Sequence, residues 1–491
     1  PLLDGLCAAV LMLFLADPLI IFDLRLQLSA LCVLAIGLTL LAVNQLGLRL
    51  VPRLPPSMNN TPSRFRPVLR ARLRNLLRGG LTLICISAAI QVALTPIQAD
   101  IFNQATPWFV LNLLWLPVLS AWVFPWAVLG LTLCAVPGLA LPAAWALDLA
   151  AMPVTWLFKL LNAMDAAHIL IAPLVVRPHG ITILGYAALL AALFMCLRHL
   201  DRKRMLPSGP RQSIGPVQVL LMAGFLCLGL GVWERYHQEH PPGLRVRMLD
   251  VGQGLSMLLE GTAGQRILVD GGGSPLSSFN VGEYVLIPLL TDNRPPRLDA
   301  VINTHPDADH LRGLLPVLRR LDVDAAWLTR PPHGTVEKML LDQALAEADL
   351  TPGRLTAGQR LDLDSRHYLE ILYPSATARG GSNQLSLAAR VVYSPEERGL
   401  FLLTGDLTKS GTRRIMKEAR VEADNANPLR CDVIQAPHHG SKNSLVKAFY
   451  ETAAPKVVVV GAGHNNQWGF PSQELRETLQ ALHIPLLNTA K

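Results

Sequence analysis

Charged side chains are scarce in this sequence of 491 residues. Asp, Glu, Lys and Arg make up 16% of the chain, hydrophobic residues make up 51%, and the mean hydropathy is +0.33. Soluble globular proteins have about 25% charged residues. The composition therefore excludes an ordinary soluble protein. The length predicts two or more domains, because a single hydrophobic core rarely grows beyond about 250–300 residues.

Cysteine is also scarce. Six of the seven Cys residues lie in apolar segments, only Cys431 lies in the C-terminal half, and no Cys-x-x-Cys pair occurs. The pattern excludes a disulfide framework. The first residues, "PLLDGLCAAV", contain neither an initiator Met nor a basic region, so we expect the sequence to begin inside a longer protein rather than at a signal peptide.

Charge divides the chain near Arg235. Up to this residue there are 17 basic against 8 acidic side chains, and beyond it there are 27 against 28. The pI of 9.3 therefore belongs to the apolar half and does not indicate a basic nucleic-acid groove on the other half. We expect an all-α polytopic membrane bundle at 1–235 and an α/β domain at 236–491.

The apolar half holds several runs near the roughly 20 residues that cross a bilayer. The stretch 107–150 is long enough for two passes with Pro-kinked helices, and 5–22 predicts another pass interrupted at Asp17. Further candidate spans are 26–48, 81–98, 152–174, 180–198 and 215–233. Five polar residues inside these runs face either a bundle interior or the headgroups. They are Asn112, Asp148, Lys159, Asn162 and Asp165.

Two basic clusters predict the orientation. One contains six Arg between Arg64 and Arg78, and the other runs from Arg198 to Arg211. The positive-inside rule puts both in the cytoplasm, separated by an even number of crossings. The last span then leads outward, so we expect 236–491 to be extracytoplasmic. The first cluster also fits an amphipathic helix on the inner leaflet, either as a topological anchor or to steer a polyanion.

From about residue 244 the hydrophobic pattern becomes that of short strands alternating with helices. This indicates sheet layers covered by helices. Strands are predicted in "LRVRMLD", "GLSMLLE", "QRILVD" and "DAVINTH", and near 367–373, 387–393, 399–404, 432–436 and 456–461. Helices are predicted near 311–320, 336–348, 407–419, 442–453 and 472–482.

The loop "THPDADH" concentrates potential metal ligands directly after a predicted strand. His305, Asp307, Asp309 and His310 lie within six positions. Imidazole and carboxylate ligands in this density can hold two divalent ions, an arrangement that suits displacement at phosphorus. A solvated Asp-rich turn and a Ca²⁺ loop are the alternatives, and the two His argue against the second because Ca²⁺ prefers oxygen ligands.

Three further motifs end predicted strands. "LLTGD" places Asp406 where a carboxylate could bridge two ions, "APHHGS" places His438 and His439, and "LVDGGG" places Asp270. Asp270 could orient a ligand His through its second ring nitrogen. Each motif alone is equally consistent with a plain turn. Together with "THPDADH", these motifs hold four of the ten His residues of this half, which favours a single dinuclear site.

The order of these motifs resembles the metallo-β-lactamase fold, an αββα sandwich. More specifically, "MLDVGQG", "LVDGGG", "THPDADH", "LLTGD" and "HHGS" resemble the C-terminal domain of the ComEC family of DNA-uptake proteins, and the segments 17–38 and 95–125 resemble the membrane part of that family. The resemblance covers nearly the whole chain. Relative to the family, an N-terminal domain and early membrane helices are expected to be missing.

The resemblance implies a site residue by residue. The metal ligands would be His305, Asp307, Asp309, His310, Asp406 and His438, with His439 as the other candidate to close the set, and Ser441 would lie beside the site. The catalytic residues would be Asp309, His438 and His439. The cofactor would be two divalent ions, Zn²⁺ or Mn²⁺. If His438 or His439 is not a ligand, it could act as general acid or base.

Two positions depart from the family pattern. No His stands in the strand before Gly405. Asn383 and Ser386 are the candidates to fill that space, so one metal would have fewer protein ligands. "NNQWGFP" has Phe470 where related sequences often have His, and we do not expect the nearby His464 to compensate. Occupancy of the second metal position is therefore the weaker part of the prediction.

The predicted function is an inner-membrane DNA-uptake channel that passes single-stranded DNA. Its extracytoplasmic domain would degrade the strand that is not imported. The implied partners are DNA, membrane lipids and other DNA-uptake components. Two alternatives remain: a non-catalytic DNA guide with a degenerate metal site, and a membrane-tethered hydrolase of another phosphoester.

Overall fold

The computed structural model describes residues 2–45, 65–105, 107–167, 169–170, 173–205, 215–274, 279–329, 336–422 and 427–490. The chain divides into two compact units, Pro1–Gly231 and Val232–Lys491. Arg64 and Arg211 lie outside the described residues, as do the side chains of the other Arg residues in the first basic cluster.

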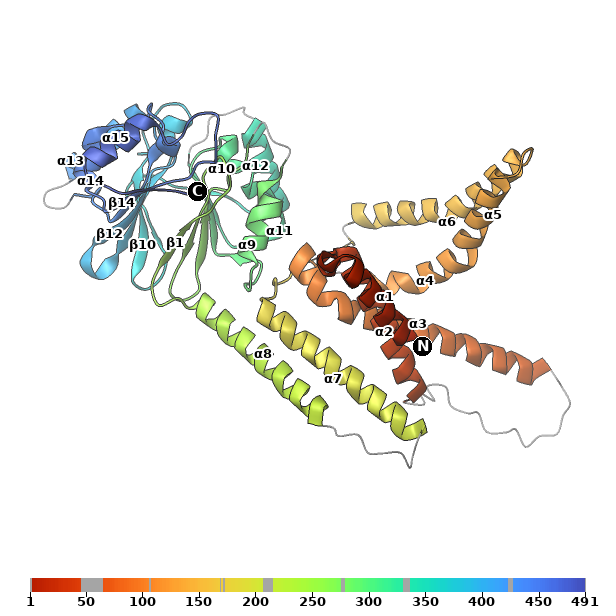
Figure 1. Cartoon of the computed structure of the whole chain (residues 1–491). Coiled ribbons are helices and arrows are strands. Elements are labelled where there is room, and N and C mark those ends of the chain that lie inside the picture. The colour runs from red at the N-terminus through yellow and green to blue at the C-terminus, as the bar shows by residue number, and fades with distance from the viewer. Residues whose placement is uncertain are drawn as a thin grey trace. The chain divides into compact units, whose positions relative to one another are not determined.

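The first unit is helical (Figure 1). The described residues contain five helical segments long and apolar enough to cross a membrane: Gly79–Phe102, Leu114–Cys134, Ala140–Ala166, Gly180–Leu200 and Gly215–Glu239. They belong to α3 (Phe65–Ile97) with the π-helix Gln98–Phe102, to α4 (Leu111–Val118) with α5 (Phe124–Cys134), and to α6 (Ala140–Ala166), α7 (Gly180–Met205) and α8 (Gly215–Glu239). The predicted all-α membrane half is confirmed.

The expectation of two passes in 107–150 followed by one in 152–174 is wrong. A π-helix at Leu119–Val123 joins α4 and α5 into one pass, and α6 begins at Ala140. Pro117 and Pro125 are accommodated beside this π-helix rather than separating two spans. The real break lies between α5 and α6, where Gly138 has φ of 87°.

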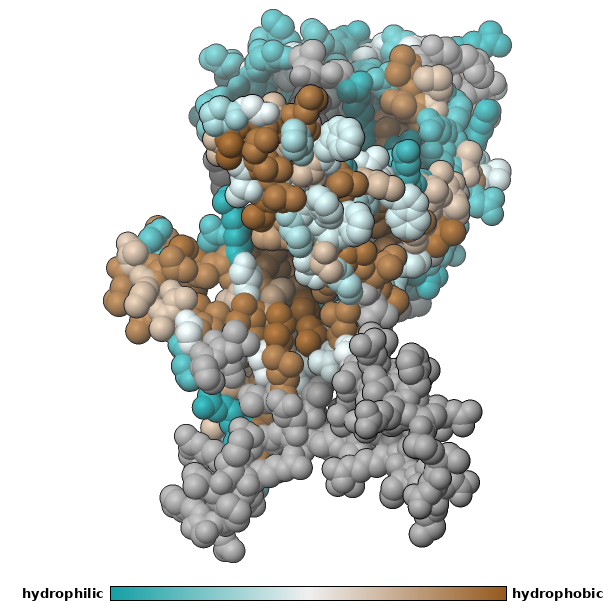
Figure 2. All heavy atoms as spheres, turned by 90° about the vertical axis from the view of Figure 1, so that its right-hand side faces the viewer, coloured by the Kyte–Doolittle hydropathy of each residue, from teal (hydrophilic) through white to brown (hydrophobic). Residues whose placement is uncertain are grey.

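The two N-terminal helices are α1 (Leu2–Ala16) and α2 (Leu24–Gln45). The predicted interruption at Asp17 is confirmed, since its Oδ1 accepts a hydrogen bond from Leu19 N (3.0 Å) and caps a 3-10 turn, Pro18–Phe22. Large apolar side chains are exposed on the helices of this unit, and Figure 2 shows broad hydrophobic surface there. Such surface is typical of helices that contact lipid. Among the polar residues in the apolar runs, Asn112 is partly buried and the other four are exposed within the unit.

The second unit contains two facing sheets between helices (Figure 1). One sheet has the order β1-β2-β3-β5-β7-β8 and the other β15-β14-β13-β12-β11-β10-β9. The strands of the first sheet are β1 (Arg245–Met248), β2 (Met257–Glu260), β3 (Arg266–Val269), β5 (Ala300–Asn303), β7 (Ala326–Leu328) and β8 (Gly353–Arg354). Those of the second are β9 (Arg360–Asp362), β10 (His367–Tyr373), β11 (Ala388–Tyr393), β12 (Arg398–Leu403), β13 (Val433–Gln435), β14 (Val457–Val460) and β15 (Leu486–Asn488).

Helices cover the outer face of each sheet (Figure 1). The first is covered by α9 (Ile287–Leu290), α10 (Ala308–Leu311), α11 (Leu314–Arg320) and α12 (Val336–Glu347). The second is covered by α13 (Lys409–Glu422), α14 (Lys447–Ala453) and α15 (Gln473–Ala481). A two-stranded sheet, β4 (Arg297–Leu298) with β6 (Asp322–Val323), completes the unit. The predicted αββα sandwich is confirmed.

Two apolar clusters hold these layers together. The strands alternate inward and outward side chains, so Leu259, Ile302, Leu369 and Phe401 meet between the two sheets. A second cluster lies between the second sheet and α13 to α15, with Ile434 from the sheet. Burial of both faces explains why the strands read as nearly continuous apolar runs.

The parallel strands place the four motifs at the edges where these strands end. β3 pairs in parallel with β5, and β12 with β13. Their C-terminal ends lead directly to Asp270, His305, Asp406 and His438 respectively. Because side chains beyond the carboxyl ends of parallel strands meet in one crevice, this topology brings together segments up to 169 positions apart in sequence.

Candidate metal centre

His310 is the most firmly held of the histidines. Its ring is fully buried in α10, and its Nδ1 lies 2.7 Å from Asp270 Oδ2. Asp270 also accepts hydrogen bonds from Asn303 Nδ2 (3.0 Å), Thr304 N (2.8 Å) and Thr304 Oγ1 (2.6 Å). A carboxylate accepts and does not donate, so the His310 proton resides on Nδ1 and the lone pair of Nε2 faces the site. The expected contact between Asp270 and a histidine is confirmed.

His305 is fixed in the same way by a hydroxyl. Its Nδ1 lies 3.0 Å from Thr304 Oγ1, whose own proton goes to Asp270, and 3.4 Å from Ser386 Oγ. The Thr304 oxygen therefore accepts from His305 Nδ1, and Nε2 is left as the free nitrogen. That nitrogen lies 3.6 Å from Asp307 Oδ2.

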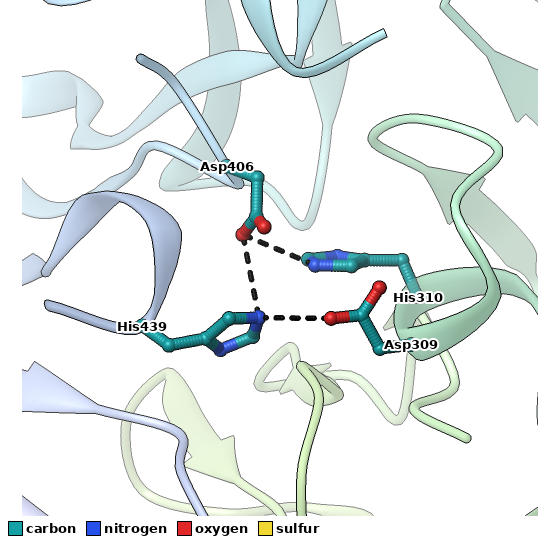
Figure 3. Close-up of side chains that lie close together, drawn as sticks. All are labelled: Asp309, His310, Asp406 and His439. Carbon is teal, nitrogen blue, oxygen red and sulfur yellow. Dashed lines mark ion pairs between the residues drawn. The ribbon is translucent and has the colours of Figure 1, made fainter. Parts of the chain in front are cut away.

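Asp406 occupies the centre of the group. Gly405 precedes it with φ of 47°, and a Cβ at Gly405 would lie 2.2 Å from Ser386 Oγ, so the tight turn requires glycine. Ser386 Oγ accepts the hydrogen bond from Asp406 N (2.9 Å). The Asp406 carboxylate is 2% exposed and is aimed between the rings of His310 and His439 (Figure 3).

His438 and His439 follow β13 in a strained loop. Both residues have left-handed backbone conformations, with φ of 51° and 54°. Such conformations cost on the order of 1–2 kcal/mol for a residue with a Cβ. His439 Nδ1 donates to Gly461 O (2.7 Å), which leaves its Nε2 toward the site. The conformation brings the two rings to different oxygens of Asp406, His439 Nε2 to Oδ1 (3.5 Å) and His438 Nε2 to Oδ2 (3.7 Å).

Four side chains form a compact group suited to one ion. One ligand atom from each of Asp309, His310, Asp406 and His439 lies within 4.8 Å of the others (Figure 3). Asp406 Oδ1 is 3.1 Å from His310 Nε2 and 3.5 Å from His439 Nε2, and Asp309 Oδ2 is 3.4 Å from His439 Nε2. Two imidazoles and two carboxylates match the ligand set of Zn²⁺ or Mn²⁺.

A second, looser group lies on the other side of Asp406. Its Oδ2 is 3.7 Å from His438 Nε2. His305 Nε2 and Asp307 Oδ2, 3.6 Å apart, form a further pair of potential ligands. Ser382 Oγ donates to Asp307 Oδ1 (2.7 Å) and fixes that carboxylate. The two oxygens of Asp406 thus face different sets of ligands, as a bridging carboxylate does between two ions.

The buried polar atoms of the site fit a cation. His305 Nε2, His310 Nε2, His439 Nε2 and Asp406 Oδ1 are buried and have no hydrogen-bond partner. Although His310 Nε2 lies near Asp406 Oδ1, these atoms are not aligned for a hydrogen bond. Buried polar atoms without partners are rare and costly. A neutral His310 with its proton on Nδ1 points the Nε2 lone pair at Asp406 Oδ1 (3.1 Å), so the position between these atoms favours a positive charge, either a second proton on the ring or a metal ion.

The pKa shifts of the site residues also indicate that the site favours a cation. Burial lowers the pKa of His310, but the carboxylates of Asp406 and Asp270 outweigh it and raise that pKa well above the usual imidazole value. Burial raises the pKa of Asp406, but the nearby His439 and His310 rings hold it well below the usual range. Burial and the neighbouring His310 lower the pKa of His305 to about 4. The centre therefore carries a negative potential that favours a bound cation.

The structure brings all predicted ligands into one site but groups them differently. The prediction listed His438 among the ligands and kept His439 as the other candidate to close the set. In the structure His439 belongs to the compact group, and His438 lies near the other oxygen of Asp406. Ser441 is buried beside the site, and its Oγ accepts from Asn443 N (3.2 Å). Ser386, predicted as one occupant of the position of the missing His, contacts His305 and Asp406, while Asn383 makes no hydrogen bond with these ligands in the described residues.

Sequence reasoning missed three supporting residues. Thr304 links Asp270 to His305, Asn303 helps to hold Asp270, and Ser382 holds Asp307. The first two stand directly before His305, and their position at a strand end was the available signal. Nothing in the local sequence marks Ser382, because it approaches from a loop 75 positions away.

Two family models match separate parts of the chain. Residues 1–200 match the family model described as competence protein, and residues 249–333 match that of the metallo-β-lactamase superfamily. The ComE operon protein 3 of Bacillus subtilis (strain 168) is 29% identical over 84% of this chain and 50% of its own length. Competence protein ComA of Neisseria gonorrhoeae is 28% identical over 58% of this chain and 35% of its own length. The chain spans half or less of these curated relatives.

Among solved structures, the metallo-β-lactamase fold protein YhfI from Bacillus subtilis is 13% identical, with a TM-score of 0.30, over 50% of this chain and 94% of that chain.

Proposed function

Because the chain belongs to the ComEC family of competence proteins, we propose that its membrane helices, up to about residue 235, pass one strand of DNA. We propose that the domain from residue 236 onward is a metal-dependent phosphodiesterase that acts on the strand left outside. The family match supports the handling of DNA at a membrane. The observation that carries the enzymatic part is the convergence of the unpartnered Nε2 atoms of His310 and His439 on Asp406 Oδ1, with His438 Nε2 3.7 Å from Asp406 Oδ2.

In this proposal the compact group, Asp309, His310, Asp406 and His439, holds one divalent ion, and His305, Asp307 and His438 contribute to a second. Bound ions would activate water and stabilise charge on phosphoryl oxygens. No side chain of the protein then needs to act as a nucleophile.

The protein residues have separate tasks. Asp270, Thr304 and the carbonyl of Gly461 orient three imidazoles so that their Nε2 atoms are free to bind. His305, His310 and Asp406 are buried and exclude water from the floor of the site. His438 and Asp309 are 28% and 30% exposed and border its open side. If His438 does not bind the second ion, it can instead hold or release a proton at a leaving oxygen.

The test is the Asp309→Ala variant of the full chain in detergent, supplied with Mn²⁺ or Zn²⁺. Cleavage of labelled single-stranded and double-stranded DNA should fall by about 100-fold or more, because even residues that only support ligands change metal affinity by about 10–100-fold. Asp309 is partly exposed, so the substitution leaves no core cavity. The exposed Asp292→Ala is the matched control.

Metal content is measured on the same samples. Cleavage by Asp309→Ala at the parent rate would contradict the dinuclear site. A parent protein that contains no stoichiometric metal and cleaves nothing, yet binds DNA, would instead favour the non-catalytic DNA guide. Specific cleavage of a small phosphoester with no cleavage of DNA would favour a hydrolase of another substrate.

A further inference from the structure

A row of three rings leads from the metal centre to the surface. The ring of Phe470 lies 6.2 Å from that of His439 with 21° between their planes, and Trp468 lies 6.3 Å from Phe470 with 17° between planes. His439 is buried, Phe470 is partly buried against the core, and Trp468 is 49% exposed. The row ends in an indole ring that is half open to solvent.

The loop that carries Trp468 is braced from within. Asn466 Oδ1 accepts from Phe470 N (2.8 Å), and its Nδ2 donates to Phe470 O (2.7 Å) and Gly463 O (3.0 Å). Gly469 takes φ of 64°, a conformation suited to glycine. These bonds close a turn around Trp468 at both ends. The loop therefore holds the indole in a defined position. A Trp with only a structural role would be expected to bury more of its surface.

The row of rings reaches the open side of the centre. Phe470 meets the ring of His438 edge-on, at 6.1 Å and 61°. His438 is the partly exposed imidazole at the mouth of the site. Trp468 thus lies one ring contact beyond a residue that touches both histidines of the strand-end loop. A DNA strand that binds at Trp468 can therefore run along this row of rings toward the proposed metal ligands.

We propose that Trp468 is a stacking platform for a base of single-stranded DNA whose adjoining phosphodiester lies at the metal centre. This rests on the phosphodiesterase function proposed above and adds a substrate-binding residue to it. A flat, half-exposed indole matches the face of a nucleobase, and stacking of this kind tolerates every base. In a duplex both faces of each base are already covered, so only an unpaired strand offers a free face.

Binding without hydrolysis provides the test. The full chain in detergent, in EDTA and at high salt to weaken phosphate contacts, is titrated into a labelled dT oligomer and an abasic oligomer of equal length. Trp468→Ala should weaken binding of the dT oligomer roughly 5- to 100-fold, the range for loss of one aromatic stack, and leave abasic binding unchanged. Trp468→Phe should retain most of the affinity.

Two further variants separate stacking from structure. Trp468→Leu keeps an apolar contact with Phe470 but has no aromatic face, so it should behave like Trp468→Ala. Tyr284→Ala removes another exposed aromatic of the same domain and should bind like the parent. Equal affinities of the parent and Trp468→Leu for the dT oligomer would overturn the proposal, as would equal losses for both oligomers.

The two proposals fail in different ways. If the base-dependent effect of Trp468 is present but the parent with Mn²⁺ or Zn²⁺ never cleaves DNA, the phosphodiesterase function fails while the platform stands. If cleavage occurs and the Michaelis constant for the dT oligomer is the same in the parent and Trp468→Leu, the platform fails alone.

Discussion

At the scale of single residues, the geometry of the proposed metal site depends on side chains that are not themselves ligands. Asp270 accepts hydrogen bonds from the backbone and hydroxyl of Thr304 and from Asn303 before it meets His310. These donors hold the carboxylate in place, so that it accepts the proton of His310 Nδ1. In the proposed site, the Nε2 atom of His310 is thereby oriented toward a metal ion.

Asp270→Asn tests this support. The amide keeps the shape but can no longer accept on both atoms, so the proton of His310 is no longer confined to Nδ1. Metal affinity of the full chain should fall by about 10- to 100-fold, the range for loss of a carboxylate partner of a ligand His. Competition with a chelator measures it, and the exposed Asp292→Asn is the control. Unchanged affinity would show that His310 needs no partner or is no ligand.

The same scale shows where sequence reasoning stops. The strand-end motifs could be recognised because each places a ligand residue directly after an apolar run, and all of them meet in the structure. The choice between His438 and His439 could not be made, since it depends on two successive left-handed residues that aim the rings differently. Phe470 stands where related sequences often have a His, and its contact with the face of His439 is a matter of tertiary packing.

At the scale of elements, longer strands and helices were predictable and short ones were not. Strands β10 to β14 and the helices from α11 to α15 agree with the predicted ranges within a few residues, because their apolar periods are clear. Strands β7 and β15 have three residues each and were missed, whereas β13, of the same length, was recognised because it precedes the His438–His439 motif. Contacts between segments distant in sequence cannot be predicted from local patterns, so the hydrogen bond between Ser382 and Asp307 could not be foreseen.

One tie between elements links the two sheets near their edges. Asp364, in the turn between β9 and β10, accepts hydrogen bonds from Thr262 N (2.9 Å) and Thr262 Oγ1 (3.0 Å) in the turn between β2 and β3. It also accepts from Arg366 N and from the backbone and ring of His367. Burial raises the pKa of Asp364, but these donors outweigh it and lower the pKa to about 2.

Asp364→Asn should therefore destabilise the domain in a pH-dependent way. The folded-state pKa lies below the usual value of about 3.9, so the carboxylate stabilises the fold above about pH 4, and this contribution is lost as the pH falls toward 2. At pH 7 the variant should lose roughly 1–3 kcal/mol of unfolding free energy. Urea unfolding of residues 236–491 between pH 7 and pH 2 measures the difference, which should shrink below pH 4. A constant difference would contradict the assignment.

At the scale of the whole molecule, charge and spans together predict the orientation. Four of the five candidate spans in the described residues, those between Gly79 and Leu200, separate the cluster of Arg64–Arg78 from that of Arg198–Arg211. An even number keeps both clusters on one side of the membrane, and the positive-inside rule makes that side the cytoplasm. The fifth span, Gly215–Glu239, would then cross once more before the C-terminal domain begins.

Reporter fusions test this orientation directly. An enzyme that is active only outside the cytoplasm, fused after Trp233, should be active, and the same enzyme fused after Lys203 should be inactive. A reporter that is active only inside should give the opposite pattern at both positions. The result matters for function because a nuclease domain on the outer side meets DNA before transport, whereas one in the cytoplasm would degrade what had been imported. Activity of the outside reporter at Lys203 and not at Trp233 would reverse the orientation and, with it, the assignment of the strand that the domain degrades.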